Sequence, residues 1–204
     1  DAADPYPPIK SAFFAMSRDL QIPYKDRCQM MGEGIYPYYI TTRHGRRCSS
    51  ATAFLRPAKG RQNLKVMTDA TVTKLIIRDG AAVGVELMQR SRSQIFSAQA
   101  EIILTAGAIG SPHILQLSGI GSGKLCQSHG IVNVCDQPNV GKHLQDHLGI
   151  NYFHLANRPT LNNVLGSWPH LMLAGLNYIM RRKGPLSLGV NQLGGLVRAT
   201  PDAP

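Results

Sequence analysis

The chain has 204 residues, 43% of them hydrophobic, and a formal net charge of +10. That length allows one large domain or parts of two, and that composition excludes wholesale disorder. Lys and Arg are scattered in runs of at most three, so we interpret the charge mainly as a solvated surface. Loss of an acidic portion of the protein is a second explanation for it.

The four cysteines, Cys28, Cys48, Cys126 and Cys135, form no C-x-x-C pair and have no spacing typical of a metal site or a disulfide framework. We expect free, mostly buried thiols in a reducing compartment, and therefore a cytoplasmic protein, with membrane association left open. No signal peptide and no run apolar enough to span a bilayer is evident. The chain starts without methionine and both ends look cut, so we expect an internal piece of a longer protein.

The N-terminal quarter predicts one helix and one irregular segment. Apolar residues recur at helical spacing over residues 9–20, and Pro23 ends that helix. Residues 32–39, G-E-G-I-Y-P-Y-Y, form a loop or an edge segment. Its tyrosines favour packing at a surface over lining a pocket.

Residues 43–57, R-H-G-R-R-C-S-S-A-T-A-F-L-R-P, combine a turn with a short helix that Ser49 or Ser50 caps. Basic residues beside a capped helix can hold a phosphate. Helix capping with solvated arginines explains the string equally well, and both interpretations stay open.

A β-rich passage follows. Residues 64–67, 71–77, 82–87 and 94–98 are predicted strands, with Asp79-Gly80 as a tight turn. Apolar and polar residues alternate only imperfectly in V-T-K-L-I-I, which indicates strands that are partly buried on both faces.

The string A-E-I-I-L-T-A-G-A-I-G-S-P-H-I-L-Q-L-S-G-I-G predicts a strand, a tight turn and a helix. Residues 102–104 form an apolar run without a polar face, typical of a strand buried on both sides. A helix is expected over residues 111–118, with Ser111 as its cap, Pro112 at its first position and Gly119 closing it. Its N-terminus would be open towards a ligand, although many α/β proteins contain such a unit.

Residues 122–129 predict a short helix ended by Gly130. The string G-I-G-S-G-K is not a phosphate-binding loop, because its spacing is wrong, no Ser or Thr follows Lys124, and it follows a helix. Towards the C-terminus, residues 169–183 predict an apolar helix, and residues 191–198 look like the start of a strand.

Residues 139–147, N-V-G-K-H-L-Q-D-H, bring His143, Asp146 and His147 together in the sequence. Two histidines four apart on a helix can share a metal, with Asp146 supplying a carboxylate. No further protein ligand is evident nearby, and no glutamate lies between the histidines as in metalloproteases. We therefore predict that His143 and His147 bind no structural metal.

Three of these strings resemble one family. Residues 107–121 resemble, over fifteen consecutive positions, the second signature of the glucose–methanol–choline (GMC) flavoprotein oxidoreductases. Residues 43–57 resemble that family's R-x-G-x-R-x-S-x-A-x-A-F-L, and residues 139–147 its V-G-x-N-L-Q-D-H, with Lys142-His143 in place of the usual residue and asparagine. The chain is similar to bacterial choline- and alcohol-dehydrogenase-like members. Exposure of residues 102–104 would count against both the predicted strand and this resemblance.

The resemblance implies an α/β (α+β) fold with FAD as cofactor. Residues 1–150 would be the middle of a FAD-binding, Rossmann-like domain with an antiparallel meander, without the N-terminal G-x-G-x-x-G segment. Residues 151–204 would begin a substrate-binding domain with an antiparallel sheet. Members oxidise CH–OH groups of alcohol or choline-type substrates, passing a hydride to flavin N5 while a histidine base takes the hydroxyl proton. We expect a small-molecule alcohol as substrate, no nucleic acid and no membrane span.

The resemblance also assigns five cofactor-binding residues. Val72 matches a valine whose backbone contacts the adenine, although an ordinary core valine would look identical. Ala106 and Gly107 form the turn at the adenosine end, and Asp146 and His147 match residues with a structural or hydrogen-bonding role near the flavin. The motif of the catalytic histidine does not occur here, so none of the seven histidines is assigned a catalytic role, and we expect this chain alone to be inactive.

Two alternatives belong to other classes of function. The first is a basic module that binds nucleic acid or another polyanion, which the charge supports, but no stacking motif or recognition-helix pattern accompanies it. The second is a truncated relative with a structural or partner role. The alcohol, the electron acceptor, oxidase or dehydrogenase behaviour and the oligomeric state stay open.

Overall fold

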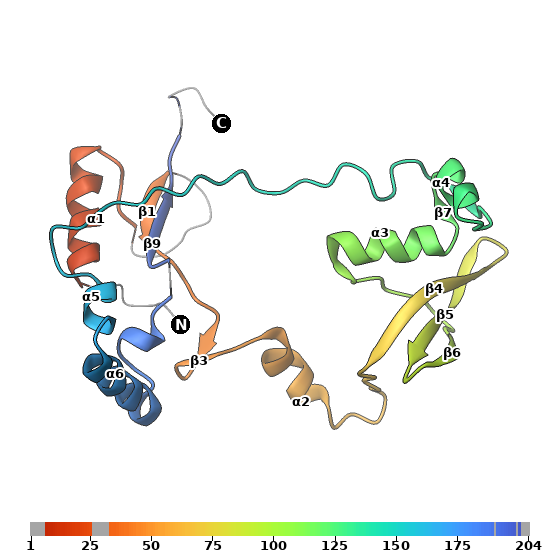
Figure 1. Ribbon diagram of the computed structural model, residues 1–204, viewed down its shortest axis with the longest axis horizontal. Coiled ribbons are helices and arrows are strands. Elements are labelled where there is room, and N and C mark those ends of the chain that lie inside the picture. Colours follow the sequence, from red (N-terminus) through yellow and green to blue (C-terminus); the bar gives the residue numbers. More distant parts are fainter. Residues whose placement is uncertain (1–6, 26–32, 190, 199, 201–204) are drawn as a thin grey trace. The chain divides into compact units, whose positions relative to one another are not determined.

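The computed structural model describes residues 7–25, 33–189, 191–198 and 200. Contacts group the chain into two units, one made of Asp1–Leu64 with Tyr152–Pro204 and the other of Lys65–Asn151 (Figure 1). The second boundary lies beside the one predicted after residue 150, whereas the N-terminal residues group with the C-terminal ones. Whether these parts act as FAD-binding and substrate-binding domains stays a prediction.

The first unit contains short elements from both ends of the chain. Strand β1 pairs antiparallel with β9, and β2 forms a small hairpin with β3. Its elements are α1 (Pro7–Asp19), β1 (Gly34–Pro37), β2 (Thr42–Arg43), β3 (Arg46–Arg47), the π-helix η1 (Ala51–Leu55), α2 (Arg56–Ala58), α5 (Leu161–Leu165), α6 (Trp168–Arg181), the 3₁₀ helix η2 (Pro185–Ser187) and β9 (Leu193–Leu196).

The pairing of β1 with β9 decides where the first unit has its core. Ile35, Tyr36 and Leu193 are buried along this pair. The tyrosine-rich segment is therefore a paired strand, and only Tyr38 and Tyr39 are exposed at its end, as expected of packing at a surface.

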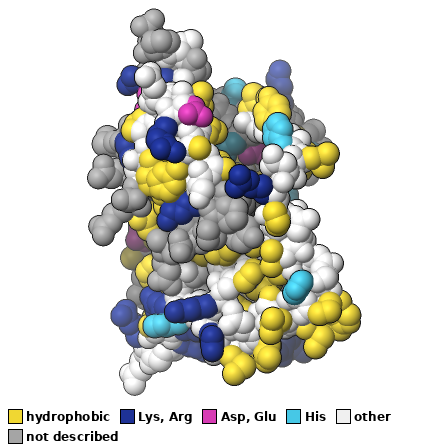
Figure 2. All heavy atoms as spheres, turned by 90° about the vertical axis from the view of Figure 1, so that its left-hand side faces the viewer, with side chains coloured by type: hydrophobic (Ala, Val, Ile, Leu, Met, Phe, Trp, Pro, Cys, Tyr) yellow, Lys and Arg dark blue, Asp and Glu magenta, His cyan; other side chains and the backbone are white. Residues whose placement is uncertain are grey.

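Helix α6 confirms the apolar helix predicted near the C-terminus. Its end is held by Arg182 in the left-handed conformation (φ 55°), whose N–H donates to the carbonyl of Tyr178. The Tyr178 hydroxyl donates to the Gly45 carbonyl at 2.8 Å, which connects α6 to the β2–β3 hairpin. Figure 2 shows hydrophobic side chains on the lower part of the face it views, where α6 lies.

The second unit is built on an antiparallel meander with the strand order β4-β5-β6. The strands are β4 (Ala70–Arg78), β5 (Ala81–Gln89) and β6 (Arg92–Ser97). The turn at Asp79-Gly80 has both residues at positive φ, 50° and 76°, as predicted for a two-residue hairpin. The strand predicted over residues 64–67 is wrong, because these residues are irregular and mostly exposed.

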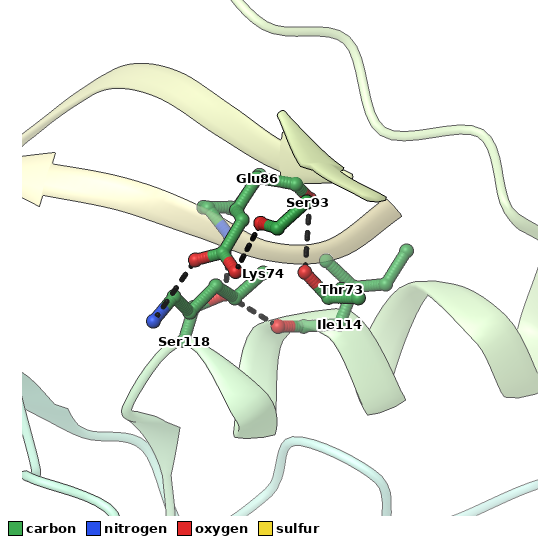
Figure 3. A network of polar contacts seen from close by, with 7 residues as sticks. Thr73, Lys74, Glu86, Ser93, Ile114 and Ser118 are labelled. Carbon is green, nitrogen blue, oxygen red and sulfur yellow. Dashed lines mark hydrogen bonds and ion pairs between the residues drawn. The ribbon is translucent and has the colours of Figure 1, made fainter. Parts of the chain in front are cut away.

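Helix α3 (Gly107–Leu117) packs against β4. Ser118, at the end of the helix, makes the connection (Figure 3). Its hydroxyl accepts the Leu75 N–H at 2.8 Å and donates to the Ile114 carbonyl. Gly119 closes α3 at φ 83°, which confirms the predicted helix end.

Beyond α3, the strand β7 (Ile120–Gly121) pairs in parallel with β8 (Cys135–Asp136). Between them lies α4 (Gly123–Ser128), with Ser122 at its N-cap and Gly130 at φ 68° just after its end. This confirms the short helix predicted here.

The strand predicted over residues 102–104 and the helix start predicted at Ser111 are both wrong. Residues 102–104 form no strand, and Ile103 is 74% exposed. A strand exists only through its neighbours, and the described residues supply none beside this run. Helix α3 also begins at Gly107 rather than Ser111, so Pro112 lies inside it, and the Ser111 hydroxyl accepts the Ala106 N–H at 3.0 Å.

Of the cysteines that the structure describes, Cys48 and Cys126 are buried, Cys135 is exposed and all three are free thiols. The fourth, Cys28, lies outside the described residues. Within the described ranges, no helix combines the length and apolar character that crossing a membrane requires.

Candidate functional site

Two motifs that are separate in the sequence lie against each other in the second unit. One side of α3 and the segment that follows Val140 face one hollow of about 730 Å³, which we call the α3 hollow. It is lined by Ala108, Ile109, Pro112, His113 and Gln116 from α3 and by Gly141, Lys142, His143, Leu144 and Gln145.

A single side chain of α3 connects the two sides of the α3 hollow. The Gln116 amide Nε2 donates to the Val140 carbonyl at 3.0 Å. Gly141 follows at φ 81°, and a Cβ there would lie 2.5 Å from the same Nε2. The close approach and the backbone angle together explain glycine at this position.

The N-terminus of α3 is open. Ala106 is its N-cap, and Gly107 has φ 84° and no atom within 4 Å of the place a Cβ would take. Both residues are exposed. The first N–H groups of a helix lack intrahelical partners and carry partial positive charge, so an anionic group can approach here at backbone distance.

Asp146 and His147 are exposed and lie in a segment without helix. The His147 N–H donates to the Asp146 carboxylate at 2.8 Å. Because the segment is not helical, His143 and His147 do not have the one-turn spacing on which a shared metal would depend. Among the described residues no group of three His, Cys, Asp or Glu side chains could hold a metal ion. That His143 and His147 bind no structural metal stays a prediction.

Val72 is half-buried in β4, paired with Leu87 of β5. The register shifts between Val72 and Lys74, so Thr73 bulges, and its hydroxyl donates to the Glu86 carbonyl at 3.1 Å. Val72 thus lies in the strand against which α3 packs, but it does not line the α3 hollow.

The charged pair of the second unit lies on the meander, away from the α3 hollow. Glu86 accepts a hydrogen bond from Lys74 Nζ at 3.2 Å and from the Ser93 hydroxyl at 3.0 Å (Figure 3). These two donors, Lys74 first, hold the pKa of the Glu86 carboxyl below its ordinary value.

The α3 hollow lies between two of the strings singled out in the sequence, but none of the five predicted cofactor-binding residues lines it, and the residue that joins its two sides was not predicted. Gln116 stands inside the signature string at residues 107–121, as a polar residue among Ile114, Leu115 and Leu117. A polar side chain on the half-buried side of a helix is a signal that it has a partner.

Comparison with known families decides the identity of the chain. Residues 10–149 match the family model described as GMC oxidoreductase, which is more than half of the chain. The chain belongs to the GMC oxidoreductase family. This confirms the resemblance drawn from the three strings, and the exposure of Ile103 counts against the predicted strand alone. Membership of this family indicates FAD as the cofactor.

Several curated relatives match most of the chain. The alcohol dehydrogenase [acceptor] of Pseudomonas putida is 42% identical over 173 residues, which is 83% of this chain and 31% of that protein. The mitochondrial choline dehydrogenase of Homo sapiens is 33% identical over 198 residues, 97% of this chain and 33% of that protein. The chain therefore spans about a third of the length of these relatives.

Two solved structures have a similar fold. A FAD-dependent oxidoreductase from Chaetomium thermophilum matches 94% of this chain and 35% of that chain, with a TM-score of 0.79 and 23% sequence identity. Pyridoxine 4-oxidase from Mesorbium loti matches 67% of this chain and 27% of that chain, with a TM-score of 0.60 and 30% identity. The fold of the first of these structures thus matches nearly the whole chain.

Proposed function

We propose that this chain is part of a FAD-dependent oxidoreductase that acts on CH–OH groups of alcohols or choline-type substrates, and that FAD binds along the α3 hollow. The observation that carries the proposal is the meeting of two motifs. Residues 107–121 and 139–147 each match the family on their own, and the structure places them around one hollow. The relatives named alcohol and choline dehydrogenase support the substrate class.

The residues present fit an elongated anionic cofactor. At one end, the open start of α3 offers unpaired N–H groups, and Gly107 leaves room for close approach. Lys142 lies on the opposite side of the hollow and adds positive charge. Asp146 and His147 follow Gln145, the last residue of the segment that lines the hollow, and both are exposed.

We assign the parts of the cofactor accordingly. Ala106 and Gly107 hold the adenosine end, and Asp146 and His147 hydrogen-bond near the flavin. The backbone of Val72 is assigned to the adenosine end on the family resemblance alone, because Val72 does not line the α3 hollow. Residues 1–150 belong to the FAD-binding domain, and residues 151–204 begin the substrate-binding domain. When bound, FAD supplies at flavin N5 the acceptor for the hydride removed from the alcohol carbon.

None of the described histidines is assigned as the base that takes the alcohol proton. Those beside the α3 hollow, His113 and His143, lie on its exposed rim. The role of this chain is therefore to bind and orient the cofactor.

Gly107→Ala tests the cofactor site, with Gly130→Ala as a matched control. Both glycines have positive φ, 84° and 68°, and neither has an atom near the place of a new Cβ. Both changes should cost about 1 kcal/mol of folding stability, because alanine is strained in this conformation. Only Gly107→Ala should also weaken FAD binding, by about tenfold, measured in the full-length protein by titration of flavin fluorescence.

Equal FAD affinity in the two variants would contradict the site. Reduction of the bound flavin by choline or simple primary alcohols, seen as loss of its visible absorbance, tests the proposed activity separately.

A further inference from the structure

We propose that Gln116 is a positioning residue, which fixes residues 140–147 against α3 and thereby sets the place of Asp146 and His147 towards the cofactor. This inference rests on the proposed function. The observation behind it is one contact: the half-buried Gln116 amide bonds to the backbone of a segment 24 residues away.

The hydrogen bond from Gln116 is directional and lies at the start of that segment. Its Nε2 donates to Val140 at 3.0 Å. The side chain also lies over β7, since a Cβ on Gly121 would be 3.1 Å from the Gln116 Cγ. The amide is therefore held between β7 and the segment, and a change of its direction would move the Val140 carbonyl.

The other hydrogen bonds of this segment are local. In the continuously described stretch 33–189, the Val140 N–H donates to Gln137, the Lys142 N–H to Asn139, and the His147 N–H to Asp146. Such bonds shape turns but do not fix them against a neighbouring element. The bond from Gln116 is the hydrogen bond that connects residues 139–147 to α3.

Glycine at position 141 fits this role. At φ 81° the backbone turns directly after the bonded carbonyl, and the Cα approaches the Gln116 amide closely. The direction in which the chain leaves this turn decides where Asp146 lies, because residues 144–150 have no regular structure of their own.

A purely structural role is the alternative. Gln116 also packs within the second unit and accepts a weak contact from the buried Cys126 thiol at its carbonyl. If Gln116 served only in packing, loss of its amide would loosen α3 and the meander together. If Gln116 positions the segment, the change should be confined to residues 140–147.

The test uses Gln116→Met, which keeps the length and volume of the side chain but removes the donor. Gln127→Met, at an exposed glutamine of α4, is the matched control. In the full-length protein without FAD, hydrogen exchange of residues 141–147 should become about three- to tenfold faster in Gln116→Met alone. Exchange in α3 and β4 should stay unchanged. FAD should bind about three- to tenfold more weakly, and its absorbance spectrum should shift.

Each other outcome has one meaning. Faster exchange throughout α3 and β4, or unchanged exchange in residues 141–147, overturns the positioning role. If Gly107→Ala weakens FAD binding and Gln116→Met does not, the inference alone is wrong. If neither variant affects FAD, the proposed cofactor site fails and the inference fails with it.

Should Gln116→Met not fold, Gln116→Glu replaces it, because the carboxylate has the same shape and lacks the N–H donor. Failure of both variants to fold would make Gln116 a residue needed for folding itself and would overturn the proposal.

Discussion

Glycines at positive φ in this chain differ in what surrounds them. Gly130 has open space where a Cβ would be, whereas a Cβ on Gly119 would overlap the Val132 carbonyl. Gly119→Ala should therefore destabilise the protein by at least twice the roughly 1 kcal/mol expected for Gly130→Ala, because backbone overlap adds to conformational strain. Urea unfolding of the two variants measures this difference, and equal midpoints would contradict it.

The Glu86 carboxyl predicts a pH dependence. Hydrogen bonds from Lys74 and Ser93 lower its pKa in the folded protein, so the carboxylate stabilises the fold at pH values above its ordinary pKa. That contribution is lost as the pH falls through the lowered pKa. The melting temperature of Glu86→Gln should therefore fall less between neutral pH and pH ~3 than that of the wild type. Glu101→Gln, at an exposed glutamate outside the meander, is the control and should follow the wild type.

For single residues, the sequence predicted the backbone conformation better than the hydrogen-bond or ion-pair partner. Gly80 was predicted in a turn and Gly119 at a helix end, and both have positive φ. Such backbone conformations depend on residues nearby in the sequence. Gln116 could not be paired with Val140 in advance, since the bond depends on how a segment 24 residues away folds back. The same holds for Glu86 and Lys74, which meet only through the register of β4 and β5.

Among the elements, α3 and β4 depend on Ser118. Its hydroxyl accepts the Leu75 N–H and donates to the Ile114 carbonyl, and the residue is buried. Ser118→Ala should cost about 1–3 kcal/mol, because the Leu75 N–H would be left without its acceptor. Ser128→Ala, at an exposed serine that bonds within α4, should cost less than half as much. Thermal unfolding compares the two, and equal losses would show that Ser118 does not connect the helix to the sheet.

Elements made by local patterns were predicted well, and elements made by distant partners were not. The meander, α4 and α6 follow from turn residues and apolar spacing within each segment. The pairing of β1 with β9 joins Gly34 to Leu196 and leaves no local signal. Residues 102–104 have the composition of a buried strand but no neighbour among the described residues, so composition alone did not make a strand.

For the molecule as a whole, exposed apolar side chains are the most informative feature. A run of exposed apolar side chains follows His147, with Leu148 96% and Phe153 93% exposed. Its members are Leu148, Ile150, Tyr152, Phe153 and Leu155. Isolated exposed apolar residues are ordinary, but runs of them mark surfaces that meet something else. We therefore expect this run to be a surface that meets another apolar surface.

The 204-residue chain expressed alone should hold FAD weakly or not at all and should not oxidise alcohols. Its proposed adenosine contacts are backbone groups of Val72, Ala106 and Gly107, and each hydrogen bond contributes about 1 kcal/mol net. Ordering a ligand of this size costs several kcal/mol, so these contacts do not suffice. A positioned base is also not assigned in the chain, and such a base is typically worth about a hundredfold to ten-thousandfold in rate.

Two measurements on the purified chain decide the matter, with the full-length protein as the control. The first is the flavin absorbance that stays with the protein after FAD is added and the excess removed. The second is reduction of a dye by choline and simple primary alcohols. A stoichiometric yellow protein would contradict the affinity argument, because it would require contacts beyond the three backbone positions. Turnover would contradict the absence of an assigned base, and His113 and His143 on the rim of the α3 hollow would then be the first residues to replace.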